Sequence, residues 1–233
     1  MPVLISLAMA VAPALILVAY YYRQDRRKPE PKGLIVKIFL LGILSIIPAI
    51  LLELAVSTLE DLVSWWRLLY YLFNAFVVAA VCEELIKLWV VKAVAYNNVH
   101  FDEVMDGVVY TVVASLGFAC MENILYVLDR GWTVALVRAF TAVPMHALCS
   151  GMMGYYIGKA KFASDKVEES ILIKRGFWIA VGIHGLYDFL LFSVPLFGIV
   201  IAFGVIPLLI VTFIVLRKKI KAAISEDRQA GRI

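Results

Sequence analysis

Residues 106–127 read DGVVYTVVASLGFACMENILYV, an apolar run with one carboxylate at its start and a second, Glu122, near its end. At 1.5 Å per residue, about 20 such residues cross the roughly 30 Å hydrocarbon core of a bilayer. A charged side chain inside such a run costs roughly 3 kcal/mol on insertion scales, so it is expected to face the bundle interior and to have a function. The stretch therefore predicts a transmembrane helix that carries a functional group.

Comparable apolar runs lie on both sides of this one, near residues 2–22, 34–56, 68–91, 132–157, 176–193 and 196–216. The whole chain is 63% hydrophobic and 17% charged, with a mean hydropathy of +0.91, whereas a soluble domain is about half apolar and a quarter charged. We therefore expect an all-α polytopic membrane helix bundle with about seven transmembrane helices. Residues 1–233 are predicted to form a single transmembrane domain, with a catalytic core at about 68–193.

The lysines and arginines predict the orientation of the bundle. They gather at residues 23–37, at Lys92, at 159–175 and at 217–232, all on one side if the spans alternate, while the other side has only Arg67 and Arg130. The positive-inside rule then places the N-terminus outside and the C-terminus in the cytoplasm. The run at 2–22 has no basic segment before it, so it is expected to be a reverse signal-anchor. The +4 net charge indicates contact with the lipid bilayer and no nucleic-acid partner.

Ionisable residues at bilayer depth are the informative feature of four consecutive spans. The candidate catalytic residues are Glu83, Glu84, Glu122, His146, His184 and Asp188. Their convergence across four spans favours a functional cavity. Glu122 is predicted to lie about two turns nearer the outer surface than the others.

Helical spacing within this set suggests hydrolytic chemistry. Lys87 lies four residues after Glu83 and three after Glu84, so it can neutralise one carboxylate, and only one of the two glutamates is expected to face a shared cavity. His184 and Asp188 are also i, i+4 neighbours, which lets the carboxylate orient the imidazole. Two histidines and glutamates around one cavity suit metal-assisted hydrolysis, or a metal-free glutamate base with histidines at the oxyanion.

The candidate metal ligands are Glu122, His146 and His184. Zinc or another divalent metal would suit these donors, and a metal-free mechanism stays open.

Other polar residues in the spans are expected to have structural roles. Glu53 is interpreted as a packing or near-interfacial residue, and Asp106 and Asp129 as solvated span ends. Arg138 is expected to pair with Asp129 or Glu122, or to extend outward to the membrane interface. The three cysteines are expected to be free. A proton- or ion-coupled transporter would also place such residues along a pathway, and a non-catalytic scaffold could keep ion pairs for packing.

The ordered motifs resemble a known family. Glu83-Glu84-x-x-Lys87, Phe118-x-x-x-Glu122-Asn123, His146-x-x-x-Ser150-Gly151 and His184-x-x-x-Asp188 look like the PrsW family of intramembrane proteases. That family is related to the CAAX-prenyl proteases and bacteriocin-processing enzymes, in which a histidine commonly stands where Glu122 stands here. The resemblance implies a multi-pass protein of the bacterial plasma membrane. It also implies the first, extracytoplasmic cut in a single-pass membrane protein, and the family's known substrate type is an anti-sigma factor.

Overall fold

The computed structural model describes residues 3–25 and 28–233, and none of them forms a strand. The α-helices are α1 (Val3–Tyr22), α2 (Lys32–Leu44), α3 (Ile46–Ser57), α4 (Arg67–Leu72), α5 (Cys82–Val94), α6 (Val104–Arg130), α7 (Trp132–Phe140), α8 (Ala142–Lys161), α9 (Lys166–Phe192), α10 (Val194–Phe197) and α11 (Val205–Gln229). Two 3₁₀ helices, η1 (Glu60–Leu62) and η3 (Ile199–Gly204), and a π-helix, η2 (Phe73–Val81), complete the described elements.

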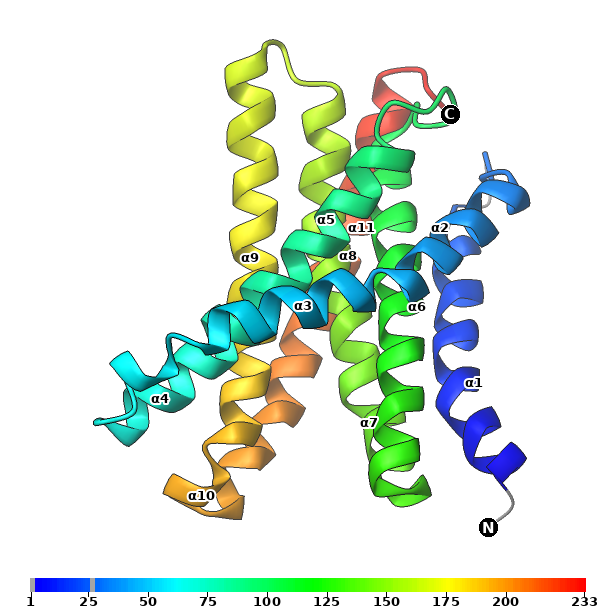
Figure 1. Cartoon of the computed structure of the whole chain (residues 1–233). Helices are drawn as coiled ribbons and strands as arrows, with labels where there is room; N and C mark the ends of the chain where they lie inside the picture. Colours follow the sequence, from blue (N-terminus) through cyan, green and yellow to red (C-terminus); the bar gives the residue numbers. More distant parts are fainter. Residues whose placement is uncertain (1–2, 26–27) are drawn as a thin grey trace.

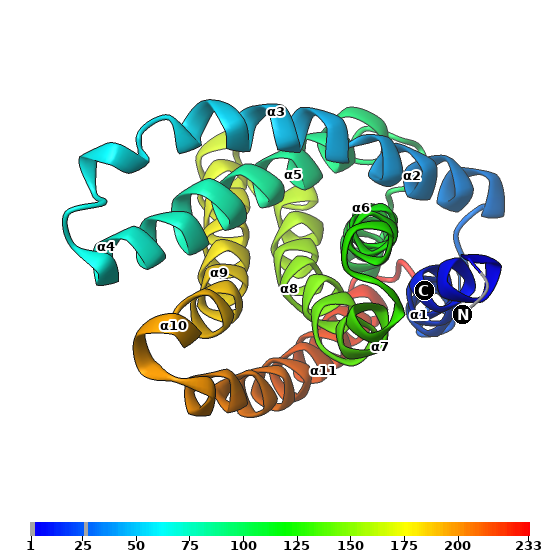
Figure 2. The ribbon, with the colours of Figure 1, turned by 60° about the horizontal axis from the view of Figure 1, so that its bottom comes forward.

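Helix α6 forms the centre of the bundle. In its 18-residue apolar stretch, 94% of the residues are buried. The helix packs against α8 on one side and against α1, α2 and α11 on others (Figures 1 and 2). Gly107 of α6 faces Gly154 and Gly158 of α8, so closely that a Cβ on any of the three would overlap the other backbone. Small residues let membrane helices approach in this way, and α9 then packs on the far side of α8.

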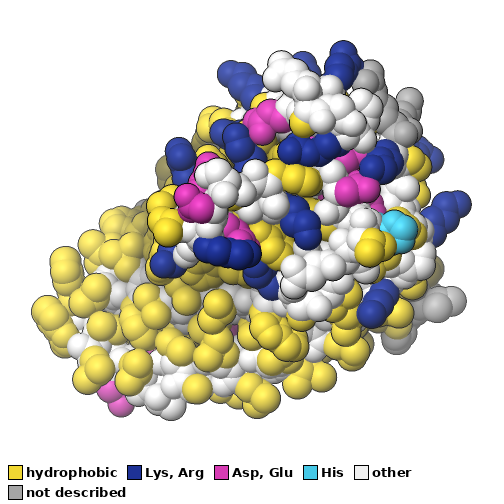
Figure 3. Space-filling view, turned by 90° about the horizontal axis from the view of Figure 1, so that it is seen from above, with side chains coloured by type: hydrophobic (Ala, Val, Ile, Leu, Met, Phe, Trp, Pro, Cys, Tyr) yellow, Lys and Arg dark blue, Asp and Glu magenta, His cyan; other side chains and the backbone are white. Residues whose placement is uncertain are grey.

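The all-α polytopic membrane bundle is confirmed. Five helical segments of the described chain are long and apolar enough to cross a membrane: 5–22, 32–62, 104–130, 132–161 and 199–229. The other two expected spans, 68–91 and 176–193, are helical and carry ionisable residues of the candidate site. The number and orientation of the crossings stay predictions. The start of α1 and the C-terminus lie at opposite ends of the bundle (Figure 1), and Lys and Arg side chains gather at the end that holds the C-terminus (Figure 3).

Two expected spans are each broken into two helices. The first break, at Ser45, separates α2 from α3, and the second, at Thr141, separates α7 from α8. Pro48 and Pro144 follow these breaks by three residues. Because proline has no N–H and its ring clashes with the carbonyl four residues earlier, it disrupts the preceding turn.

The segment that leads into α5 is wound as a π-helix, η2, and not as the uniform α-helix expected over 68–91. π-helical turns are rare and frequent at functional sites, and this one ends at Val81, directly before Cys82, Glu83 and Glu84. The connection between α8 and α9 is short, because α8 continues to Lys161 and α9 begins at Lys166.

The interpretation of Asp106 as a solvated span end is wrong. Its side chain is completely buried, and it accepts hydrogen bonds from the backbone N–H groups of Asp102 (2.8 Å) and Glu103 (2.7 Å). The first turn of α6 is further capped by Asp227 of α11, which accepts from Val104 and Met105. Unpaired N–H groups at a helix start attract carboxylates, which explains the burial.

Candidate active site

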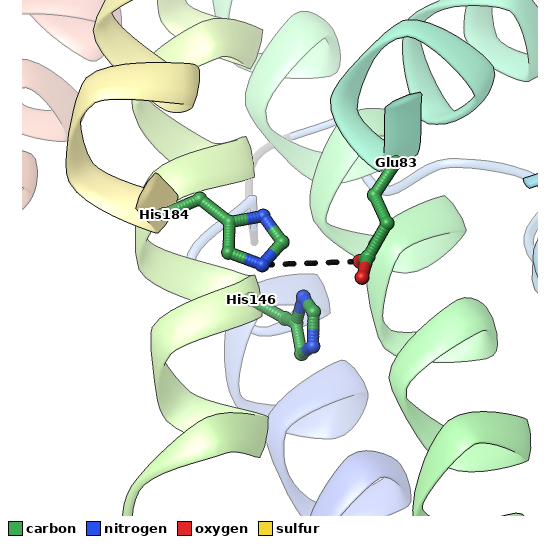
Figure 4. Close-up of side chains that lie close together, drawn as sticks. All are labelled: Glu83, His146 and His184. Carbon is green, nitrogen blue, oxygen red and sulfur yellow. Dashed lines mark ion pairs between the residues drawn. The ribbon is translucent and has the colours of Figure 1, made fainter. Parts of the chain in front are cut away.

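Four helices bring their ionisable residues together. Glu83 comes from α5, Glu122 from α6, His146 from α8 and His184 from α9. The two imidazole rings lie edge to face, with centroids 5.1 Å apart, and Figure 4 shows that both point toward the Glu83 carboxylate. The short separation keeps both histidines within reach of one water or ion.

Lys87 is the cation of the cluster. Its fully buried Nζ lies 3.0 Å from Glu83 Oε2, 2.8 Å from Glu84 Oε1 and 3.1 Å from His146 Nδ1. An ammonium has only donors, so His146 Nδ1 accepts from Lys87 and its other nitrogen carries the proton. The lysine thus neutralises the glutamate pair and selects the His146 tautomer.

His184 is held between carboxylates. Its Nδ1 lies 2.9 Å from Glu84 Oε1, while Nε2 lies 3.3 Å from Asp188 Oδ2 and 3.9 Å from Glu83 Oε2. Glu84 also accepts a hydrogen bond from Ser150 Oγ at 3.1 Å. Carboxylate partners of this kind set the orientation of an imidazole, so Nε2 is turned toward Glu83 and Asp188.

Glu122 lies at the level of His146, and the prediction that it sits two turns nearer the outer surface is wrong. Its Oε2 is 2.9 Å from His146 Nε2 and 2.7 Å from Arg138 of α7. The α7–α8 break lets Arg138 reach back to α6. Of the two partners that the sequence left open for Arg138, Glu122 is the one observed, and Asp129 pairs with Arg130.

The two adjacent glutamates differ in what they face. Glu83 lines a cavity of about 750 Å³ together with Glu122, His146, His184 and Asp188, whereas Glu84 lies outside that lining and is completely buried. This agrees with the expectation that only one of the pair faces a shared cavity.

The cavity wall includes a residue that sequence analysis interpreted as packing. Glu53 of α3 is half-buried and lines the same cavity. A lone acid in the 34–56 span was the signal available in the sequence, but without a motif around it nothing linked it to the distant glutamate pair.

The donor atoms suit a metal in kind and in spacing. Ligand atoms of Glu83, His146 and His184 all lie within 4.8 Å of one another, and two imidazoles with one carboxylate form a donor set known from catalytic zinc. No such group of three among the described residues includes Glu122, which the sequence placed among the ligands. Metal binding there requires His146 to give up one of its two contacts, because Nδ1 faces Lys87 and Nε2 faces Glu122.

The rest of the cavity is largely apolar. Its wall is completed by Ile46 and Ile50 of α3, by Phe203 of η3 and by Ile206 of α11, and it extends to Arg130 at the end of α6. The polar cluster thus lies at one side of an apolar cavity within the membrane-spanning bundle. This fold and site define a polytopic membrane protein with a buried Glu/His centre of the kind used for hydrolysis.

Comparison with known proteins gives the family. A profile described as "PrsW family intramembrane metalloprotease" matches residues 30–216. The chain is 37% identical over 192 residues to "Protease PrsW" of Geobacillus kaustophilus, with 82% of each chain covered. It is 34% identical over 217 residues to "Protease PrsW" of Oceanobacillus iheyensis, with 93% of this chain and 95% of the relative covered. It is 33% identical over 191 residues to "Protease PrsW" of Bacillus subtilis, with 79% and 82% covered. No solved structure matches significantly.

The chain belongs to the PrsW family. It is an intramembrane peptidase and a multi-pass protein of the bacterial cell membrane. The resemblance noted from the ordered motifs is confirmed.

Proposed function

We propose that the peptidase makes the first, extracytoplasmic cut in a single-pass membrane protein, using Glu83 with His146 and His184. The observation that carries this proposal is the convergence of these three side chains on one membrane-level cavity in a chain whose relatives are named proteases. By its family resemblance, the substrate is an anti-sigma factor.

Glu83 is the proposed proton acceptor, because it alone of the glutamate pair lines the cavity. A water beside it bonds through its oxygen to the carbonyl carbon of the scissile peptide, and its proton passes to a Glu83 oxygen. That proton then moves to the amide nitrogen as the C–N bond breaks. Glu84 acts as a positioning residue, since its oxygens are engaged by Lys87, His184 and Ser150.

An imidazole is proposed to donate from Nε2 to the carbonyl oxygen on which negative charge develops, after exchanging its carboxylate partner for that oxygen. His184 is oriented by Glu84 and Asp188, and His146 donates from Nε2 to Glu122. Arg138 lies 2.7 Å from Glu122 and neutralises the carboxylate that accepts from His146. The side chains are therefore oriented before the substrate enters, and the donating imidazole has to exchange one hydrogen bond.

A divalent metal fits the same residues. Glu83, His146 and His184 would hold it, and when bound it supplies a Lewis acid that makes water acidic enough to attack near neutral pH. The family description as a metalloprotease supports this version. Glu83 is required in either version, as a ligand or as a base.

The position of the cavity supports an extracytoplasmic cut. It extends from His146 toward Arg130, at the α6 end that lies away from the C-terminus and its gathered basic side chains (Figures 1 and 3). The sequence predicts that this end faces outward. The apolar walls from α3, η3 and α11 suit a membrane-embedded peptide segment.

The test is cleavage of a tagged single-pass anti-sigma factor in liposomes that contain the purified protein. Glu83→Gln should lower cleavage at least about a hundredfold, as expected when a general base is lost. Glu168→Gln, the same change at an exposed position of α9, should cleave like the unmodified protein. Full activity of Glu83→Gln would refute the assignment. Ion flux through the same liposomes without cleavage would favour the transporter alternative.

A further inference from the structure

A second cluster of carboxylates lies at the opposite end of α6 from the active-site cavity. Asp25 and Glu30 come from the connection between α1 and α2, and Asp106 comes from the first turn of α6. One oxygen of each lies within 4.8 Å of the others, and the three residues are 4%, 4% and 0% exposed. Asp106 precedes Glu122 by about 24 Å along the helix axis, so this cluster is separate from the proposed peptidase site.

Several oxygens in this cluster lack a partner. Asp25 Oδ2, Asp106 Oδ1 and the neighbouring Glu103 Oε1 are enclosed and accept no hydrogen bond from the part of the chain that the structure describes. Asp106 uses only its other oxygen for the backbone N–H groups at the start of α6. Buried polar atoms are almost always paired, so these free oxygens indicate a missing partner.

No described lysine or arginine supplies that partner. Lys28, which lies between Asp25 and Glu30 in the sequence, has its Nζ 2.7 Å from Asp102 in a half-exposed pair. None of the ion pairs among the described residues involves Asp25, Glu30 or Asp106.

We propose that Asp25, Glu30 and Asp106 bind a hard divalent cation, Mg²⁺ or Ca²⁺. The donors are oxygens alone, which suit these ions, whereas a site for zinc or copper would include imidazole or thiolate. The Tyr110 hydroxyl hydrogen-bonds the Glu30 carboxylate and, at 3.2 Å, the His100 backbone carbonyl. It thus holds a ligand in place, as outer partners do around metal ligands.

The cation would join two parts of the fold that are distant in sequence. Glu30 stands directly before α2, which packs on α6 and continues into α3, the helix that brings Glu53 and Ile50 to the active-site cavity. A bound ion therefore anchors the start of the α2–α3 arm to the first turn of α6. This role is structural and does not depend on the proposed peptidase mechanism.

The experiment uses the full chain purified in detergent micelles and stripped with EDTA. Titration with MgCl₂ or CaCl₂ should raise the melting temperature in a saturable way, by roughly 5 °C or more at a hundredfold excess over Kd. The double variant Asp25→Asn/Glu30→Gln should lose this shift. In EDTA it should melt at or above the unmodified protein, because a buried charge without a partner has been removed. Asp102→Asn, at the exposed neighbour, should keep the shift.

Two outcomes overturn the proposal: no melting shift of the unmodified protein with either ion, or an equal shift in the double variant. The shift should also persist in His146→Ala and Glu83→Gln. A loss of cleavage in those two variants with the shift retained separates this site from the peptidase site. If the unmodified protein cleaves no substrate, the melting experiment still tests the cation site, because it is carried out without substrate.

Discussion

Replacing Lys87 by methionine removes the ammonium from between two buried carboxylates while keeping an unbranched side chain that is one atom shorter. Lys87 and Glu84 are completely buried and Glu83 is 7% exposed, with Nζ–oxygen distances of 2.8 Å to Glu84 and 3.0 Å to Glu83. Removing one member of a buried ion pair costs about 3–5 kcal/mol, because the remaining charge has no compensation. Domains are stable by only about 5–15 kcal/mol, so this variant should lose a large share of its stability.

The assay is reversible unfolding in mixed micelles, followed by helical circular dichroism. Lys92→Met is the matched control, since Lys92 lies on the same helix, is half-exposed and pairs with Glu169 at 3.6 Å. It should cost under about 1 kcal/mol, the usual value of an exposed pair. Adding Glu84→Gln to Lys87→Met should cost much less than Glu84→Gln does alone, with a coupling of about 1–3 kcal/mol.

The reasoning fails if Lys87→Met costs no more than Lys92→Met. It also fails if the effects of Lys87→Met and Glu84→Gln simply add, because the ammonium and the carboxylate would then not interact across the 2.8 Å that separates them. Cleavage activity should be lost together with stability in Lys87→Met, since His146 also loses its hydrogen-bond donor.

Three further outcomes are expected. Arg138→Met should lower cleavage about 10- to 100-fold, because Glu122 loses its cation and no longer orients His146, while Arg138→Lys should recover part of it; equal activity of all three proteins would contradict the role. A zinc chelator such as phenanthroline should abolish cleavage, and added Zn²⁺ should restore it. If elemental analysis finds no metal in fully active protein, Glu83 acts as a base and not as a ligand. Reporters fused after residue 163 should be cytoplasmic and those after residue 131 external, and a reversed pattern would overturn the predicted orientation.

Part of the candidate site was readable from local spacing. The contact of Lys87 with the glutamate pair and the contact of His184 with Asp188 follow from i, i+3 and i, i+4 neighbours on a helix. The level of Glu122 was predicted wrongly, because its height relative to His146 depends on where α6 and α8 cross and not on its position within its own apolar run. The burial of Asp106 was missed for a related reason. Its partners are backbone groups of the preceding loop and its neighbours are carboxylates from the α1–α2 connection.

The sequence by itself determined the class of this protein. Apolar runs of membrane-spanning length require helices in lipid, since every backbone N–H and C=O must be paired within the chain, and the cost of burying charge marks the functional residues. Only the tertiary structure decided that Glu83 and not Glu84 lines the cavity, that Arg138 pairs with Glu122, and that Glu53 joins the cavity wall. The direction that a side chain faces depends on helix rotation and crossing, and here also on the π-helical turns before α5 and the breaks at Ser45 and Thr141. Such features arise from packing between distant segments, which a local pattern of residues does not encode.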